Sequence, residues 1–222
     1  MDIAALLLAD SRFPGGGHVH SGGLEEAVAR GLVVDVPSLR AFLAGRLRTA
    51  GELAAVFAAA SAARMGDWAR LDAELDARTP SPAQRSASRA QGRATLRAGA
   101  VAWPSEELRA LAATTPRPHH PIVLGALATL AGGSPAGAAA AAGYLAVSGP
   151  ASAAIRLLGL DPFAVNAAVA DLAPALRDQA ERAAATARDD PAALPAPGSP
   201  GLDLLAESQL RNHHAEVRLF AS

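Results

Sequence analysis

The residues with the clearest chemical potential lie in one short segment, Phe13 to Glu26, which holds five glycines and two histidines. Such a segment can cradle a phosphate, hold a metal ion or form a shaped docking loop. A dinucleotide-binding loop would need Gly at the position of His20, and the Walker phosphate loop needs lysine, a residue that this chain lacks. A serine nucleophile at Ser21 in the G-x-S-x-G pattern would need Gly at the position of Val19. The phosphate-loop and serine-nucleophile interpretations are therefore rejected.

Metal binding depends on the histidines, all of which occur in pairs: His18/His20, His119/His120 and His213/His214. In an extended segment His18 and His20 point to the same side and can share nickel or zinc. No pair has the i, i+4 spacing that places two imidazoles on one helical face. We expect no permanent metal site, and His18 and His20 are the weak candidates for a transient contact. A small helical metal-binding enzyme that uses the paired histidines is the alternative function.

Four arginines, Arg85, Arg89, Arg93 and Arg97, recur every four residues and form one stripe along a predicted helix. The planar guanidinium suits carboxylates and protein interfaces, and the alternative, above all for Arg93 and Arg97, is a solvated face. Gly92 in the same helix costs about 1 kcal/mol relative to Ala, so we expect a neighbouring helix to approach there. No acid–base couple stands out from the surface charge, so no catalytic residue is predicted.

The C-terminal segment 216–222 reads Glu-Val-Arg-Leu-Phe-Ala-Ser, an apolar pair beside a charge. If Leu219 and Phe220 are exposed, burial by a partner protein would gain ~1.5–3 kcal/mol for each fully buried side chain. The alternative is that the pair folds back onto the core of its own chain.

The composition indicates closely packed helices. Half of the 222 residues are apolar but only 4% are aromatic, because alanine dominates, and alanine favours helices at short separations. A net charge of -1 gives no reason to expect a nucleic-acid partner. The absence of cysteine excludes disulfides and thiolate chemistry, and no segment resembles a signal peptide, so we expect the cytoplasm.

Prolines and glycines divide the chain into helices, and no segment alternates as a strand does. Residues 118–155 lack Asp, Glu and Arg, but Pro121, residues 132–135 and Gly149-Pro150 interrupt them, so we expect a buried hairpin and no membrane span. The sequence predicts one all-α domain, 1–222, a bundle of about ten helices with a mobile loop at 189–201. The expected helices span 2–10, 21–31 with Ser21 as cap, 37–49, 52–65, 67–78, 82–100, 105–113, 122–131, 135–148, 151–158, 162–188 and 202–214.

The two ends of the chain together resemble the UreF family of urease accessory proteins. The family pattern Pro-x-Gly, an aromatic- or His-rich stretch and Ser-x-Gly-Leu-Glu is matched by Pro14, Gly16, His18 to His20, Ser21, Gly23, Leu24 and Glu25. The family tail Arg-Leu-Phe-x-Ser is matched by Arg218, Leu219, Phe220 and Ser222. The segments 85–93, 119–125 and 154–157 resemble the family's landmarks between the two ends.

This resemblance implies a non-enzymatic, all-helical homodimer that binds the accessory protein UreD (also called UreH) and recruits the GTPase UreG. It implies a chaperone role in GTP-dependent nickel insertion into apo-urease, with no cofactor beyond a transient contact with Ni2+. The residues that it implies for partner binding are Pro14, Gly16, Ser21, Gly23, Leu24, Glu25, Arg85, Arg89, His119, His120, Arg218, Leu219, Phe220 and Ser222.

Overall fold

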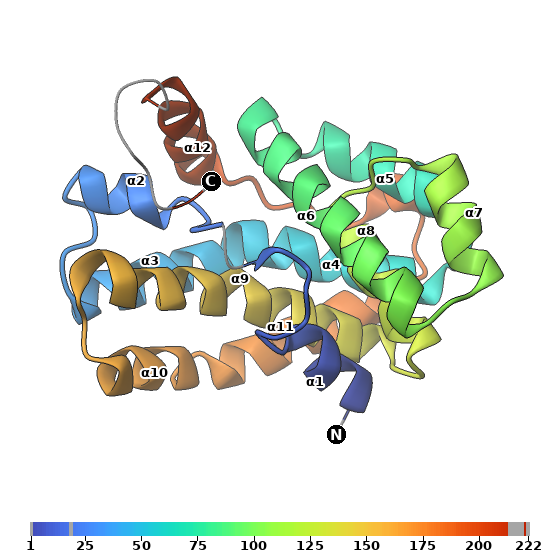
Figure 1. Cartoon of the computed structure of the whole chain (residues 1–222), viewed down its shortest axis with the longest axis horizontal. Coiled ribbons are helices and arrows are strands. Elements are labelled where there is room, and N and C mark those ends of the chain that lie inside the picture. The colour runs from blue at the N-terminus through green and yellow to red at the C-terminus, as the bar shows by residue number, and fades with distance from the viewer. Residues whose placement is uncertain (1, 18–19, 213–219, 221–222) are drawn as a thin grey trace.

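The computed structural model describes residues 2–17, 20–212 and 220, and within these ranges every regular element is a helix (Figure 1). The prediction of an all-α fold is confirmed. The α-helices are α1 (Ile3–Ala9), α2 (Leu24–Ala29), α3 (Val36–Arg46), α4 (Glu52–Ala63), α5 (Trp68–Ala77), α6 (Pro82–Ala102), α7 (Glu106–Thr114), α8 (His120–Leu130), α9 (Pro135–Leu158), α10 (Pro162–Ala170), α11 (Ala173–Ala185) and α12 (Pro200–Asn212). A π-helical turn, Leu47–Gly51, joins α3 to α4.

The core is built around α4 and α9, which lie side by side and are covered by α8 and α11 (Figure 1). Nine residues of α4 are buried, Leu53 and the eight consecutive positions from Ala55 to Ala62, and five of the nine are alanine. Gly125 of α8 shows how close the helices come, because a Cβ added there would lie 2.2 Å from the carbonyl oxygen of Ala58. Small side chains therefore set the short separations, as the composition predicts.

Helix α9 corrects one prediction, since residues 135–148 and 151–158 form a single helix that passes through Gly149 and Pro150. Proline inside a helix removes the N–H that would bond to the carbonyl four residues earlier, here that of Ala146. In this fold the Nε of Arg46 donates to that carbonyl oxygen at 2.8 Å. A donor from a residue 100 positions away thus replaces the missing one, and no local sequence signal reveals it.

Two other boundaries also differ from the prediction. The expected helix 162–188 is two helices, α10 and α11, because the chain turns at Asp171 and Leu172 and restarts with Pro174 in the first turn of α11. Helix α2 is not capped by Ser21. Its cap is Gly23 in the left-handed region (φ 88°), although the Oγ of Ser21 still accepts a hydrogen bond from the N–H of Glu25 at 3.2 Å.

The segment 189–201 is largely a loop, as predicted, with one 3-10 turn at Pro191–Ala193 and with α12 beginning at Pro200. It lies against α5, where Arg70 pairs with Asp190 at 2.7 Å, and Pro191 and Leu194 are buried. The mobility expected of this segment stays a prediction.

Among the described residues, α9 alone is long and apolar enough to cross a membrane by length and composition. More than half of its most apolar window, 56%, is buried inside the protein, where it packs on α4 and α11. These contacts make α9 the central helix of the core.

Candidate functional site

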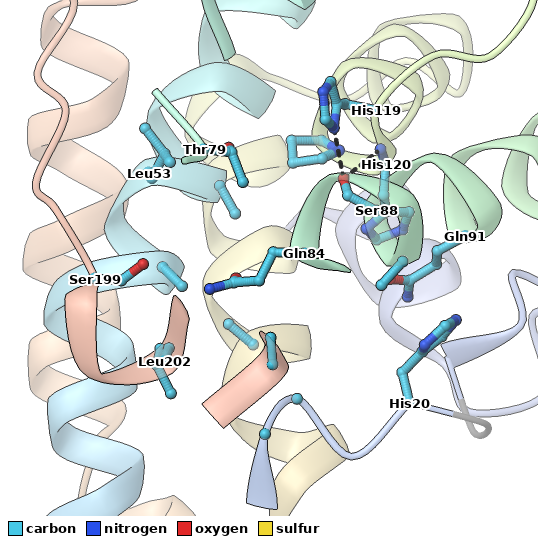
Figure 2. A pocket seen from close by; sticks show the side chains of 18 of the residues that line it. His20, Leu53, Thr79, Gln84, Ser88, Gln91, His119, His120, Ser199 and Leu202 are labelled. Carbon is cyan, nitrogen blue, oxygen red and sulfur yellow. Dashed lines mark hydrogen bonds between the residues drawn. The ribbon is translucent and has the colours of Figure 1, made fainter. Parts of the chain in front are cut away.

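Two neighbouring cavities, of about 180 Å³ and about 530 Å³, lie between the N-terminal segment, α6, α8 and α9. Six residues line both of them, and we call this set the shared wall: His20, Gly22, Arg46, Gln91, Leu145 and His120. Figure 2 shows His20, Gln91 and His120 at the same end of the smaller cavity. The second histidine of the sequence motif and the first residue of α8 are thus brought to one place.

Arg46 is the charged residue of the shared wall. Its Nε donates to the carbonyl of Ala146, and its Nη1 donates to the carbonyl of Gly22 at 2.7 Å. Burial lowers the pKa of Arg46 to about 10, which still leaves the guanidinium protonated at neutral pH. In the part of the chain that the structure describes, no carboxylate pairs with it. The sequence analysis did not identify this residue.

His120 of the shared wall is uncharged at neutral pH. Burial, followed by the proximity of His20, lowers the pKa of His120 to about 4. A neutral imidazole can bind a metal ion through its free nitrogen. However, no three His, Asp or Glu side chains among the described residues are grouped closely enough to hold a metal. His18, His213 and His214 lie outside the described residues.

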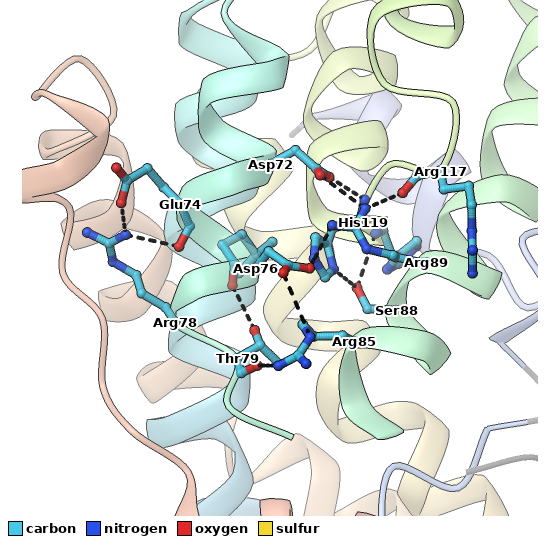
Figure 3. A network of polar contacts seen from close by, with 12 residues as sticks. Asp72, Glu74, Asp76, Arg78, Thr79, Arg85, Ser88, Arg89, Arg117 and His119 are labelled. Carbon is cyan, nitrogen blue, oxygen red and sulfur yellow. Dashed lines mark hydrogen bonds and ion pairs between the residues drawn. The ribbon is translucent and has the colours of Figure 1, made fainter. Parts of the chain in front are cut away.

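His119 belongs to a separate polar network beside the smaller cavity (Figure 3). Its side chain is 1% exposed, and its Nε2 lies 3.0 Å from Asp76 Oδ1 while its Nδ1 lies 3.0 Å from Ser88 Oγ. Burial is the main cause that lowers the pKa of His119, although Asp72 opposes the shift. A neutral His119 would donate from Nε2 to the ionised Asp76 and accept at Nδ1 from the hydroxyl of Ser88.

Ser88, His119 and Asp76 therefore follow the order of hydrogen bonds found in a hydrolase triad. Acyl transfer also requires free N–H groups to stabilise the oxyanion. At the start of α8 the N–H of His119 donates to Asp72 at 2.7 Å, and that of His120 donates to Ser88 at 3.3 Å. The next residue, Pro121, has no N–H. These N–H groups are occupied, so the network is better suited to fix the N-terminus of α8 than to catalyse a reaction.

The four arginines of the predicted stripe have different surroundings. Arg89 binds Asp72 and Asp76 of α5, at 3.0 and 2.6 Å, and Arg85 donates to the carbonyl of Thr79 at 2.7 Å. Arg97 is exposed and Arg93 half-buried. The prediction that Gly92 admits a close neighbour is confirmed, because an added Cβ would lie 2.0 Å from the carbonyl oxygen of Pro118, just before α8.

The N-terminal motif leads into α2, which lies against α12 (Figure 1). Glu25 and Glu26 are buried, and they accept hydrogen bonds from Gln209 Nε2 at 3.1 Å and from Ser208 Oγ at 2.7 Å. Ser21, Gly23 and Leu24 are also buried, whereas Pro14 is exposed and Gly16 half-buried. Most of the motif residues therefore shape the protein from inside, and their role in partner binding stays a prediction.

The end of the chain meets the same region. Phe220 is 3% exposed and belongs to the core cluster that includes Leu24, Leu43 and Val147, which agrees with the alternative that it folds back onto its own chain. The guanidinium of Arg156 lies 4.4 Å from the centre of its ring. The other predicted tail residues lie outside the described residues: Arg218, Leu219 and Ser222.

Sequence analysis missed Arg46, Asp72, Asp76, Ser208 and Gln209. The two aspartates had a usable signal, since they are spaced i, i+4 and so match the spacing of Arg85 and Arg89. The other three residues have no neighbours in the sequence that distinguish them.

Known proteins of one family are similar to this chain over nearly its whole length. The family model described as UreF matches residues 33–173. The chain is 46% identical over 217 residues to the urease accessory protein UreF of Mycobacterium sp. (strain JLS), which covers 98% of this chain and 97% of that protein. It is 44% and 43% identical to the proteins of the same name from Mycolicibacterium vanbaalenii and Mycobacterium marinum, with 98% of this chain and 97% of each relative covered. The chain belongs to the UreF family of urease accessory proteins.

Proposed function

We propose that this chain is a non-enzymatic scaffold that binds UreD/UreH and recruits the GTPase UreG for GTP-dependent nickel insertion into apo-urease. The observation that carries the proposal is the similarity to urease accessory proteins over 98% of the chain. The occupied N–H groups beside Ser88 and the absence of a metal-binding cluster among the described residues agree with a role in binding. We further propose that the protein acts in the cytoplasm as a homodimer.

The proposed docking region is the end of the molecule where α2 and α12 meet. Glu25 and Glu26 hold α12 on α2 through hydrogen bonds, and Phe220 is buried in the core cluster that includes Leu24 of α2. Two segments from opposite ends of the sequence can thus form one surface. A partner protein that binds this surface would contact exposed side chains of α12 such as Leu204 and Leu210, which are 69% and 51% exposed.

Co-expression with UreD and UreG, followed by size-exclusion chromatography, tests the proposal. We expect the three proteins to elute together, and Arg218→Ala to weaken that association. Arg12→Ala is the matched control, because the side chain of Arg12 is 89% exposed and pairs only with nearby Asp10. If this chain elutes alone while both partners are soluble and in excess, the scaffold proposal is wrong.

A transient contact with Ni2+ at His20 is the second part of the proposal. His20 and His120 line both cavities, and neutral imidazoles are suitable nickel ligands. The positive charge of Arg46 in the same wall disfavours a permanently held cation. We expect elemental analysis of the isolated protein to give less than one nickel per chain, and His20→Ala to slow urease activation while the complex still forms. One tightly held metal ion per chain, without partner binding, would favour the metal-enzyme alternative.

A further inference from the structure

The most unusual charge in the interior is that of Arg46. An arginine side chain has five N–H groups, and among the described residues two of them have partners, the carbonyls of Ala146 and Gly22. The remaining three are on Nη1 and Nη2, beside the two cavities that Arg46 lines. Arg46 is half-buried, and a partly desolvated charge gains from an oppositely charged partner, so these N–H groups favour an anionic ligand.

The walls of the cavities do not supply the missing negative charge. Among the described residues that line the cavities, Asp10 is the only acidic one, whereas three are arginines, Arg46, Arg78 and Arg156. Asp10 forms an ion pair with Arg12 at 2.6 Å, which lowers the pKa of Asp10 to about 2, and Arg78 forms an ion pair with Glu74. Arg46 has no carboxylate partner among the described residues, so its charge favours an anion over a cation in the shared wall.

The same walls also offer neutral hydrogen-bond donors. Gln91 belongs to the shared wall, and the larger cavity adds the hydroxyls of Tyr144 and Ser148. Tyr144 is 41% exposed, so this side of the cavity reaches solvent and a ligand can enter. A charged fork with neutral donors around it is the usual composition of a site for a small oxygen-rich anion.

The backbone around Arg46 is also specialised. The π-helical turn Leu47–Gly51 begins at the next residue, and such turns occur often at functional sites. Together with the hydrogen bond to Ala146, it fixes the base of the guanidinium and leaves the Nη1 and Nη2 edge available. The side chain is thus held in place before any ligand arrives, which lowers the entropy lost on binding.

We propose that the shared wall binds a small oxyanion, of the phosphate or carboxylate type, on the Nη1 and Nη2 edge of Arg46. The ligand would neutralise the charge of the Arg46 guanidinium. The site is independent of UreD and UreG, so it can be measured on the isolated protein, and its failure would leave the scaffold proposal untouched.

Titration of the purified chain with inorganic phosphate and with 13C-labelled acetate, followed by 31P and 13C NMR at constant ionic strength, tests the proposal. The two probes separate a tetrahedral from a planar ligand. We expect saturable binding of at least one of them at one site per chain. Arg46→Met should reduce the affinity at least about tenfold, because it removes the charge and the N–H donors while keeping an unbranched apolar side chain. Arg97→Met, which removes an exposed arginine from α6, should bind as the wild type does.

If Arg46→Met does not fold, as judged by circular dichroism, Arg46→Gln takes its place, since it removes the charge but keeps a donor for the two carbonyls. Unchanged affinity in the folded variant would overturn the proposal. Absence of saturable binding of both probes to the wild-type protein would overturn it as well.

Discussion

Arg46 Nε donates to the carbonyl oxygen of Ala146 at 2.8 Å, and this is the carbonyl that Pro150 deprives of its helical partner. The side chain of Arg46, the last residue of α3, therefore supplies the donor that this backbone carbonyl of α9 would otherwise lack. The contact makes a proline tolerable in the central helix of the protein, and it couples Arg46 to a segment of α9 that lies 100 positions later in the sequence.

This coupling gives a double-mutant prediction. Pro150→Ala restores a backbone N–H that can donate to Ala146, so the loss of Arg46 should then matter less. We expect Arg46→Met to be less destabilising in the Pro150→Ala background by about 1 kcal/mol, the net contribution of one hydrogen bond. Urea unfolding of the four proteins measures the difference. An equal effect in both backgrounds would show that the Arg46 contact does not replace the missing helical bond.

Gly92 and Gly45 form a matched pair for helix packing. An added Cβ at Gly92 would lie 2.0 Å from the carbonyl oxygen of Pro118, whereas nothing lies within 4 Å of one at Gly45. We expect Gly92→Ala to lower the free energy of unfolding by roughly 2–3 kcal/mol through overpacking. Gly45→Ala should raise it by about 0.5–1 kcal/mol, because alanine is the better helix former. Chemical denaturation of both variants checks the signs, and a neutral Gly92→Ala would contradict the close approach of α6 to the start of α8.

His120, the half-buried histidine of the shared wall, predicts a pH dependence. The pKa of His120 is about 4 in the folded protein and 6.5 without the fold, so the unfolded chain binds the proton more tightly. Stability should therefore fall as the pH decreases from about 7 towards 4. For this one group the loss between pH 7.5 and 5.5 is roughly 1 kcal/mol. His120→Gln, which does not titrate, should show a loss smaller by that amount in thermal or urea unfolding. Identical pH profiles for the two proteins would contradict a neutral His120.

Phe220 and Phe163 compare a buried and an exposed phenylalanine. Phe220 is 3% exposed in the core and stacks under Arg156, whereas Phe163 is 85% exposed at the start of α10. We expect Phe220→Ala to destabilise the protein by about 3 kcal/mol through the cavity that it leaves. Phe163→Ala should stay within about 0.5 kcal/mol of the wild type. The melting temperatures of the two variants measure this difference, and similar values would contradict the burial of Phe220 in the core.

The fold class and most of the helices follow from the sequence because proline, glycine and capping residues act locally. The side chains of Ser81, Ser105 and Ser134 cap the helices that follow them, and such capping residues can be recognised in a single sequence. Pro150 misled the prediction because its effect is cancelled by Arg46, which lies 100 positions earlier in the sequence. Local rules fail where a distant side chain satisfies the backbone.

The candidate site was predicted only in part. His20 and His120 were singled out as histidines, but their common position in the shared wall depends on how α8 meets the N-terminal segment. Arg46 is one of 20 basic residues, and nothing near it in the sequence indicates burial or the lack of a carboxylate. A missing partner is a property of the folded molecule, so composition and spacing cannot reveal it.

The hydrogen bonds between α2 and α12 have a consequence for the synthesis of the protein. Glu25 and Glu26 obtain hydrogen bonds from Gln209 and Ser208, which are translated more than 180 residues later. In a nascent chain α4, α8 and α9 can pack on one another before α12 has left the ribosome. The hydrogen bonds of Glu25 and Glu26 with Gln209 and Ser208 can form only after that. A chain that ends before residue 200 would lack α12, so Glu25 and Glu26 would lose the donors Gln209 and Ser208.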